Sequence, residues 1–160
     1  MLYCSLLLVC AYAVSCLGAA NFTVGQKFQI VLSAVPNVTN NTKITPADAA
    51  VWDVDAFDTD SSIIYALKKQ GKIVVCYFSA GTYESWRSDA NQFTAGDRGA
   101  TLAPQWPDEY WFNIRSANVR KVIASRIVMA ARKGCDAVDP DNVGTRIFQI
   151  FHCATAYSGD

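Results

Sequence analysis

The ten residues KIVVCYFSAG, at positions 72–81, decide the fold of this chain. Every residue between Lys72 and Ser79 is apolar or aromatic, and the run is rich in β-branched side chains, so both faces of the predicted strand should be covered. Such strands are typical of parallel sheets flanked by helices. Other strand patterns lie at 27–36, 50–57 and 135–141, and helical patterns lie at 58–72 and 116–135.

Strands that alternate with helices predict right-handed parallel crossovers, and therefore an α/β fold. No glycine-rich phosphate loop follows the first strand, which argues against a nucleotide-binding doubly wound sheet. Acidic residues follow the carboxyl ends of the strands, where a (β/α)8 TIM barrel carries its active site. A barrel takes about 250 residues, so this chain of 160 residues is expected to hold about the first half of one.

The helical pattern at 116–135 places its apolar side chains on one face and ends at Gly134. The residues expected on this buried face are Val119, Val122, Ile123, Ile127 and Ala130 or Ala131. The segment 82–114 is interpreted as a long irregular connection with a functional role. Its exposed aromatics would stack on sugar rings; they are Tyr83, Trp86, Trp106 and Trp111. The alternative is that Trp106, Tyr110 and Trp111 pack in the core or within the loop.

Composition excludes some classes of partner. The formal net charge is zero and no basic run occurs, which argues against nucleic acid. The sole histidine, His152, cannot build a metal site alone. We therefore expect neither a metal nor a cofactor.

Residues 1–20 form an uncharged apolar run that ends in small residues, which predicts a signal peptide cleaved near Ala20. A retained membrane anchor is the alternative, because the run is near the lower length limit for a bilayer span. Three N-x-[ST] sequons follow within 21–50, at Asn21, Asn37 and Asn40. Together these features predict a secreted glycoprotein with no stable membrane association after cleavage.

Three of the six cysteines lie in the predicted signal peptide, which leaves Cys76, Cys135 and Cys153. Cys76 and Cys135 fall on predicted buried strands and form either a disulfide or two packed thiols. Cys153 is then without a partner.

The segment GCDAVDPDNVG, at 134–144, places carboxylates at the end of the last predicted strand. Residues two apart on a strand point to the same side, so Asp139 and Asp141 should face together, as should Asp53 and Asp55. Crowded carboxylates raise one another's pKa, so one can hold a proton while another stays ionised. Glycoside hydrolysis requires this division of roles.

Each of these features also has a simpler interpretation. The aspartates between 53 and 60 suit a solvated turn and a helix cap. Glu84 and Arg87 suit a surface ion pair. The DPDN segment at 139–142 suits a turn that ends a strand.

Three segments together closely resemble glycoside hydrolase family 114. They are WDVDAFDTDSSIIYALKKQGKIVVCYFSAGTYESWRSDANQF, PDEYWFNIRSANVRKVIASRIVMAARKGCDAV and DPDN, and the resemblance runs from about residue 51 to 142. The resemblance implies a TIM-barrel glycosidase of the endo-α-1,4-polygalactosaminidase or α-galactosidase type. It implies that the substrate is a polysaccharide containing galactosamine or galactose.

Carried over by position, the resemblance implies that Asp141 is a catalytic carboxylate, with Asp139 beside it on the same face. It implies a substrate-binding role for a group of polar residues, namely Asp55, Tyr77, Ser79, Glu84, Arg87 and Asn142. The family's second catalytic carboxylate, a glutamate on a later strand, has no counterpart here.

The predicted organisation is a signal peptide at 1–20, a glycosylated segment with the first strand at 21–50, a partial barrel at 51–143 and a divergent tail at 144–160. The predicted function is that of a secreted glycosidase whose activity is reduced or lost in this short chain. A carbohydrate-binding fragment without catalysis is the alternative.

Overall fold

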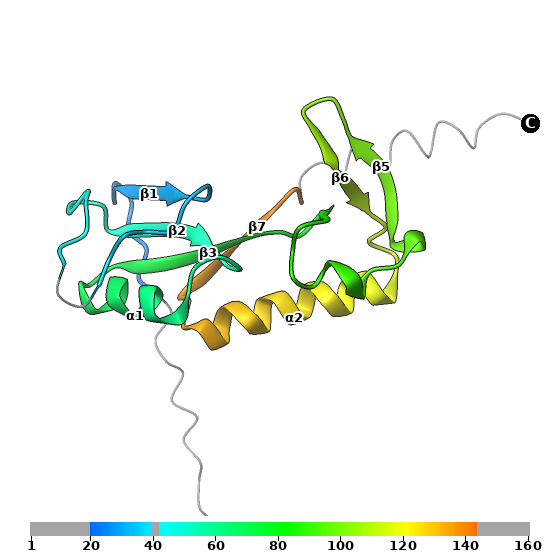
Figure 1. Ribbon diagram of the computed structural model, residues 1–160. Helices are drawn as coiled ribbons and strands as arrows, with labels where there is room; N and C mark the ends of the chain where they lie inside the picture. The colour runs from blue at the N-terminus through cyan, green and yellow to red at the C-terminus, as the bar shows by residue number, and fades with distance from the viewer. Residues whose placement is uncertain (1–19, 40–41, 144–160) are drawn as a thin grey trace, which may run out of the picture.

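The computed structural model describes residues 20–39 and 42–143, and its centre is a four-stranded parallel sheet (Figure 1). The strands are β1 (Phe28–Val31), β2 (Val51–Asp55), β3 (Ile73–Ser79) and β7 (Ala137–Asp141), in the order β1-β2-β3-β7. All three pairings are parallel, which confirms the predicted α/β class. The predicted signal peptide up to residue 19, the sequon asparagine Asn40, and the tail with Cys153 lie outside the described residues.

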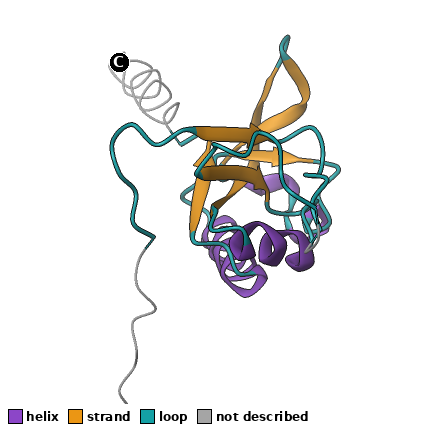
Figure 2. Cartoon of the chain, turned by 90° about the vertical axis from the view of Figure 1, so that its left-hand side faces the viewer, coloured by secondary structure: helices purple, strands orange, loops and turns teal. Residues whose placement is uncertain are grey.

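Two helices, α1 (Ser61–Lys69) and α2 (Ala117–Lys133), cover the same face of this sheet (Figures 1 and 2). Ile64 and Leu67 of α1 and Ala130 of α2 pack with the sheet residues Val54 and Cys76 in one buried cluster. A doubly wound sheet has helices on both faces. Helices on one face alone are the arrangement of a barrel wall.

Helix α2 has well-defined ends because its sequence supplies both caps. The Ser116 side chain accepts hydrogen bonds from the backbone N–H groups of Asn118 and Val119. At the other end, Gly134 takes the left-handed conformation with φ 96°, as the sequence predicted. The helix therefore delivers the chain directly into β7.

The face of the sheet opposite the helices changes from apolar to polar along the strands. Residues paired in register on parallel strands share a face, so Phe28, Val51 and Ile73 form its first layer. Tyr77 pairs in register with Asp139 and Ser79 with Asp141, two layers of polar residues at the carboxyl ends. The parallel register thus concentrates polar side chains at one rim of the sheet.

The segment 82–114 is not the irregular connection that the sequence suggested. It contains a second, antiparallel sheet of order β4-β6-β5, made of β4 (Thr82–Glu84), β5 (Arg98–Leu102) and β6 (Trp106–Phe112). Two 3-10 turns, Ala90–Gln92 and Ala95–Asp97, lie between β4 and β5. The strand signal is weak because β4 has three residues and the pairing of β5 with β6 shifts register.

This second sheet is held by its own aromatic cluster. Phe93 and Phe112 have ring centroids 4.5 Å apart, and both pack with Val119 and Val122 of α2. Tyr83 belongs to the same cluster and is buried, so the expectation that it is an exposed stacking face is wrong. The second sheet is therefore anchored on the first half of α2.

The predicted exposure of three other side chains has mixed outcomes. Ile127 was expected on the buried face of α2, but 47% of it is exposed. Ile127 instead lines an open groove between α2 and the second sheet. Trp86 and Trp106 are exposed, as expected for residues that could stack on sugar rings.

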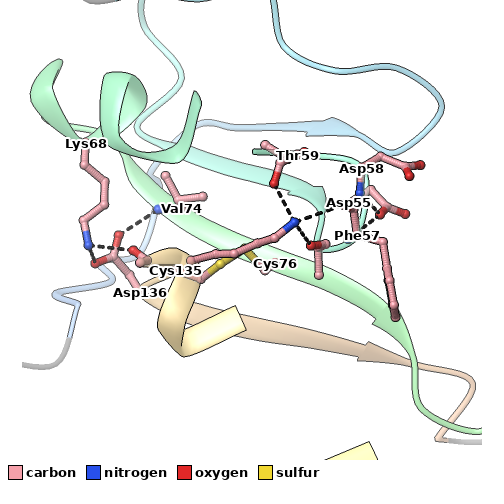
Figure 3. The surroundings of a disulfide bond; sticks show 12 residues. Asp55, Phe57, Asp58, Thr59, Lys68, Val74, Cys76, Cys135 and Asp136 are labelled. Atoms are coloured by element: carbon pink, nitrogen blue, oxygen red, sulfur yellow. Dashed lines mark hydrogen bonds and ion pairs between the residues drawn. A yellow bond between two sulfur atoms is a disulfide. The ribbon is translucent and has the colours of Figure 1, made fainter. Parts of the chain in front are cut away.

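The two internal cysteines form a disulfide, Cys76–Cys135, that joins β3 to the short segment between α2 and β7 (Figure 3). Asp136 lies beside it and accepts hydrogen bonds from the Val74 backbone N–H and from Lys68. Asp136 thus lies directly before β7, away from the rim that carries Asp139 and Asp141. Its role is to fix the entry of the strand.

Within the described residues, no helix has the length and apolar character needed to cross a bilayer.

Candidate active site at the carboxyl ends of the strands

Asp141, the last residue of β7, is oriented by two hydrogen bonds. The Tyr77 hydroxyl donates to its Oδ2 at 2.9 Å, and the Asn142 backbone N–H donates to its Oδ1 at 2.7 Å. The Ser79 hydroxyl lies 3.4 Å from the Tyr77 oxygen. Burial, opposed in part by Ser79, raises the pKa of the Tyr77 phenol, as does the negative charge of Asp141. Tyr77 therefore stays protonated and remains a donor to Asp141.

A second pair of carboxyl groups, Asp53 and Asp139, lies deeper than Asp141 along the strands. Asp139 pairs in register with Tyr77, and Asp53 pairs with Val75 one layer below. Burial, together with the adjacent Asp139 carboxyl, raises the pKa of Asp53 to about 7. At neutral pH the Asp53 carboxyl is therefore protonated for part of the time. The solvated-turn interpretation is wrong for Asp53 and Asp55, which are buried, whereas Asp58 and Asp60 are exposed.

Arg87 is surrounded by acidic side chains. Its Nε donates to Glu84 Oε2 at 2.7 Å, its Nη2 lies 3.2 Å from Glu84 Oε1, and its Nη1 lies 2.8 Å from Asp55 Oδ2. Its guanidinium also stacks on the Phe57 ring at 4.9 Å. The ion pair with Glu84 is buried, with 6% and 4% of the two side chains exposed, and is not the surface pair considered above.

Glu109 is an acidic residue at this rim that the sequence did not single out. It lies on β6 directly opposite Glu84 of β4, and its Oε2 accepts a hydrogen bond from the Thr82 hydroxyl at 2.9 Å. Burial raises the pKa of Glu109; the Thr82 hydrogen bond opposes this rise, and the charges of Glu84 and Asp141 add to it. Sequence reasoning missed Glu109 because the pairing of β4 with β6 was not predicted.

Arg126 of α2 was also missed, because it follows the polar pattern of an exposed helix face. Only 1% of the residue is exposed. Its Nε and Nη2 bind the two oxygens of Asp89 at 2.8 and 2.9 Å, and its Nη1 donates to the Ser79 carbonyl at 2.6 Å. Arg126 thereby ties the loop after β4 to the end of β3.

A groove of about 650 Å³ lies beside this rim, between α2 and the second sheet. Its lining is mostly apolar and includes Trp111, Ile114 and Ile123. It touches the site only at Gly81 and Asn142, and none of the acidic residues lines it. The acidic residues therefore gather at the strand ends, outside this groove.

The structure brings together all the site residues that the sequence predicted. They line one rim of the parallel sheet: Asp55, Tyr77, Ser79, Glu84, Arg87, Asp139, Asp141 and Asn142. Among the described residues, no group of histidine, cysteine or acidic side chains has the arrangement of a metal site. Several carboxylates with unlike surroundings are the groups needed for acid and base catalysis.

A helix-covered parallel sheet with carboxylates at its carboxyl ends defines an α/β protein of the TIM-barrel type. Comparison with known proteins assigns the family. The sequence model described as glycoside-hydrolase family GH114 matches residues 13–147, and the chain belongs to this family.

Two solved structures share this fold. Ega3 from Aspergillus fumigatus, crystallised in complex with galactosamine, is 47% identical over 78% of this chain, with a TM-score of 0.70. The glycoside hydrolase domain of PelA from Pseudomonas aeruginosa is 15% identical over 78% of this chain and 46% of its own, with a TM-score of 0.61. The present chain spans about half of Ega3, 47% of its length. No curated protein sequence matches the chain.

Proposed function

We propose that this chain belongs to a secreted glycosidase that cleaves α-linked galactosamine or galactose polysaccharides, with Asp141 as a catalytic carboxylate. The observation that carries the proposal is the orientation of Asp141 at the strand ends by Tyr77 and Asn142. Ega3, a relative at 47% identity, was crystallised with galactosamine. Family membership supports the same class of reaction.

Asp139 and Asp141 are proposed to take the two carboxyl roles of the reaction. In glycoside hydrolysis, one carboxyl group protonates the leaving oxygen, and a carboxylate attacks the sugar or activates water. Asp141 is proposed for the second task. Asp139, which lies two residues before Asp141 on the same face of β7, is proposed for the first.

The remaining polar residues of the rim are proposed to bind the substrate. Asp55 and Glu84 present carboxylates held by Arg87, and Ser79 and Asn142 flank Asp141. Trp86 follows this cluster by sequence and is 56% exposed, so its ring is available for stacking on a sugar. Such a surface suits a polymer with several sugars in contact.

Two features of the structure support secretion. The Cys76–Cys135 disulfide is typical of proteins that fold in an oxidising compartment. The sequon asparagines Asn21 and Asn37 are both exposed, as N-glycosylation requires. We therefore retain the predicted signal peptide, sequon glycosylation and extracellular location as part of the proposal.

The test is the release of reducing ends from an α-1,4-linked galactosamine polymer, with an α-galactoside polymer as the second arm. Wild type should cleave one of them at a reduced but measurable rate, in line with the sequence-based prediction, and Asp141→Asn should lower that rate by at least about 100-fold, as expected for loss of a catalytic acid or base. Asp108→Asn, at an exposed position, is the matched control. Calorimetric binding without cleavage would instead identify a carbohydrate-binding module, and absence of both would refute the proposal.

A further inference from the structure

The second sheet contacts the end of β7 through a short chain of hydrogen bonds. The Asn142 side-chain amide donates to Thr82 Oγ1 at 2.9 Å, and the Thr82 hydroxyl donates to Glu109 Oε2 at 2.9 Å. Thr82 is fully buried, and 8% of Glu109 is exposed. Glu109 is thus the far end of a path that leads to the residue next to Asp141.

Asn142 is a position where small movements have consequences for Asp141. Its φ is 63°, a left-handed conformation that asparagine tolerates better than most residues. The Asp141 carbonyl accepts hydrogen bonds from the Ala80 and Gly81 backbone N–H groups at 3.0 and 3.1 Å. The Asn142 N–H is itself one of the two donors to the Asp141 carboxylate. Displacement of Asn142 would therefore change the orientation of that carboxylate.

The chain of hydrogen bonds needs an acceptor at its far end. A threonine hydroxyl carries a single hydrogen, and here its oxygen already accepts from Asn142. The hydrogen must point elsewhere, and Glu109 supplies the acceptor. Without Glu109, the fully buried Thr82 hydroxyl would lose its partner, and its rotation would remove the lone pair that holds Asn142.

The location of Glu109 is unfavourable for a purely structural residue. It lies directly opposite Glu84 in the antiparallel pairing, and like charges in that relation destabilise a sheet. Glu84 is already bonded to Arg87, and Glu109 forms no ion pair among the described residues. Burial raises its pKa, which shows that its charged form is disfavoured there. A buried carboxyl with these costs is consistent with a specific task.

We propose that Glu109 is a positioning residue, which acts through Thr82 and Asn142 to hold the catalytic Asp141 in its working orientation. This inference rests on the function proposed above. It gives the β4-β6 pairing a role in the reaction: the second sheet fixes the turn that follows β7.

Four variants test this inference: Glu109→Gln, Glu109→Ala, Thr82→Val and the double variant of the last two. The first readout is the Asn142 side-chain amide resonance, measured by NMR on the whole chain. The second is kcat and KM on the polymer that wild type cleaves. Asp108→Asn serves again as the control on the same strand.

Glu109→Ala and Thr82→Val should each shift the Asn142 resonance and lower kcat by about 100-fold, the usual cost of a misplaced reacting group. KM should change little. The double variant should be no worse than Thr82→Val, because both changes break one path. Glu109→Gln should retain the Asn142 resonance and most of kcat, since its amide oxygen still accepts from Thr82.

The outcomes separate this inference from the proposed function. Failure of wild type to cleave either polymer would refute the function, and the NMR readout would still decide whether Glu109 holds Asn142. An unchanged Asn142 resonance in Glu109→Ala, or additive losses in the double variant, would overturn the inference. Equal loss of kcat and of thermal stability in all variants, Glu109→Gln included, would also overturn it, because a structural role alone predicts that result.

Discussion

Replacement of Arg126 by methionine should destabilise the fold strongly, although the residue lies on a helix with many polar neighbours. Its guanidinium forms a bidentate pair with Asp89 and a hydrogen bond to the Ser79 carbonyl, and 1% of the residue is exposed. Methionine has a similar length and retains most of the packing against Phe57 and Phe93. The variant therefore tests the charge and its hydrogen bonds more than the volume.

The expected loss of folding stability follows from the Asp89 carboxylate, which the substitution leaves without its ion-pair partner. Removal of one partner of a buried ion pair costs about 3–5 kcal/mol. Asp89 retains some contact with water, with 13% of its side chain exposed, so we expect a value at the lower end, about 3 kcal/mol. With a urea m-value of about 1.5 kcal/mol/M, the unfolding midpoint should fall by about 2 M.

The assay is urea unfolding followed by circular dichroism, with Arg132→Met as the matched control. Arg132 lies on the same helix and is exposed, so its replacement should change the free energy of unfolding by less than about 0.5 kcal/mol. Equal midpoints for Arg126→Met and wild type would refute the assignment of Arg126 as a buried anchor. A double variant that also carries Asp89→Leu should recover part of the loss, because no unpaired charge remains.

Three further perturbations follow from the structure. Relative to Asp53→Asn, wild type should lose stability as the pH rises from about 4 to about 7, because folded Asp53 keeps its proton up to a pKa of about 7 while the unfolded side chain releases it near 3.8. Gly81→Ala should cost about 1–3 kcal/mol, because an added Cβ would come too close to the Asn142 carbonyl oxygen. Conversion of Cys76 and Cys135 to alanine should cost about 4 kcal/mol, since the disulfide closes a loop of 59 residues.

Each of these has a direct check. Urea midpoints of wild type and the Asp53 variant, measured from pH 4 to 8, must diverge as described; parallel curves would contradict the raised pKa. Gly96→Ala, whose Cβ would meet nothing nearer than 3.8 Å, is the control for Gly81. For the disulfide, an unchanged thermal midpoint in the double alanine variant would show that the unfolded chain is not constrained by it.

The parallel sheet could be predicted because its signal is local. The run from 73 to 79 is continuously apolar, and β3 occupies those residues. Likewise, α2 begins beside a serine cap and ends at a glycine, and both features act within one helical turn. The carboxylates at 139 and 141 could be placed together because strand geometry repeats every two residues.

The second sheet could not be predicted because its strands are defined by pairing. Thr82, Tyr83 and Glu84 make too short a run to indicate a strand, and the register of β5 with β6 is interrupted. Glu109 was missed for the same reason, since its proximity to Glu84 depends on that pairing. Arg126 was missed because a charged residue in a helix is exposed in most proteins, and only the loop that carries Asp89 buries this one.

The choice between a disulfide and two thiols was also beyond the sequence. Cys76 and Cys135 lie on adjacent segments, but a bond requires Cα atoms within a narrow range of distance. Their Cα atoms are 6.0 Å apart, and this value depends on the β3–β7 pairing.

The chain enters the second sheet after β3 and leaves it before α2 at two points that lie close together. The Phe112 N–H donates to the Gly81 carbonyl, and the Asn113 N–H donates to the Asp97 carbonyl. Figure 1 shows the β5–β6 hairpin projecting away from the parallel sheet. The tip of that hairpin can therefore change in length or sequence while the scaffold around it keeps its structure.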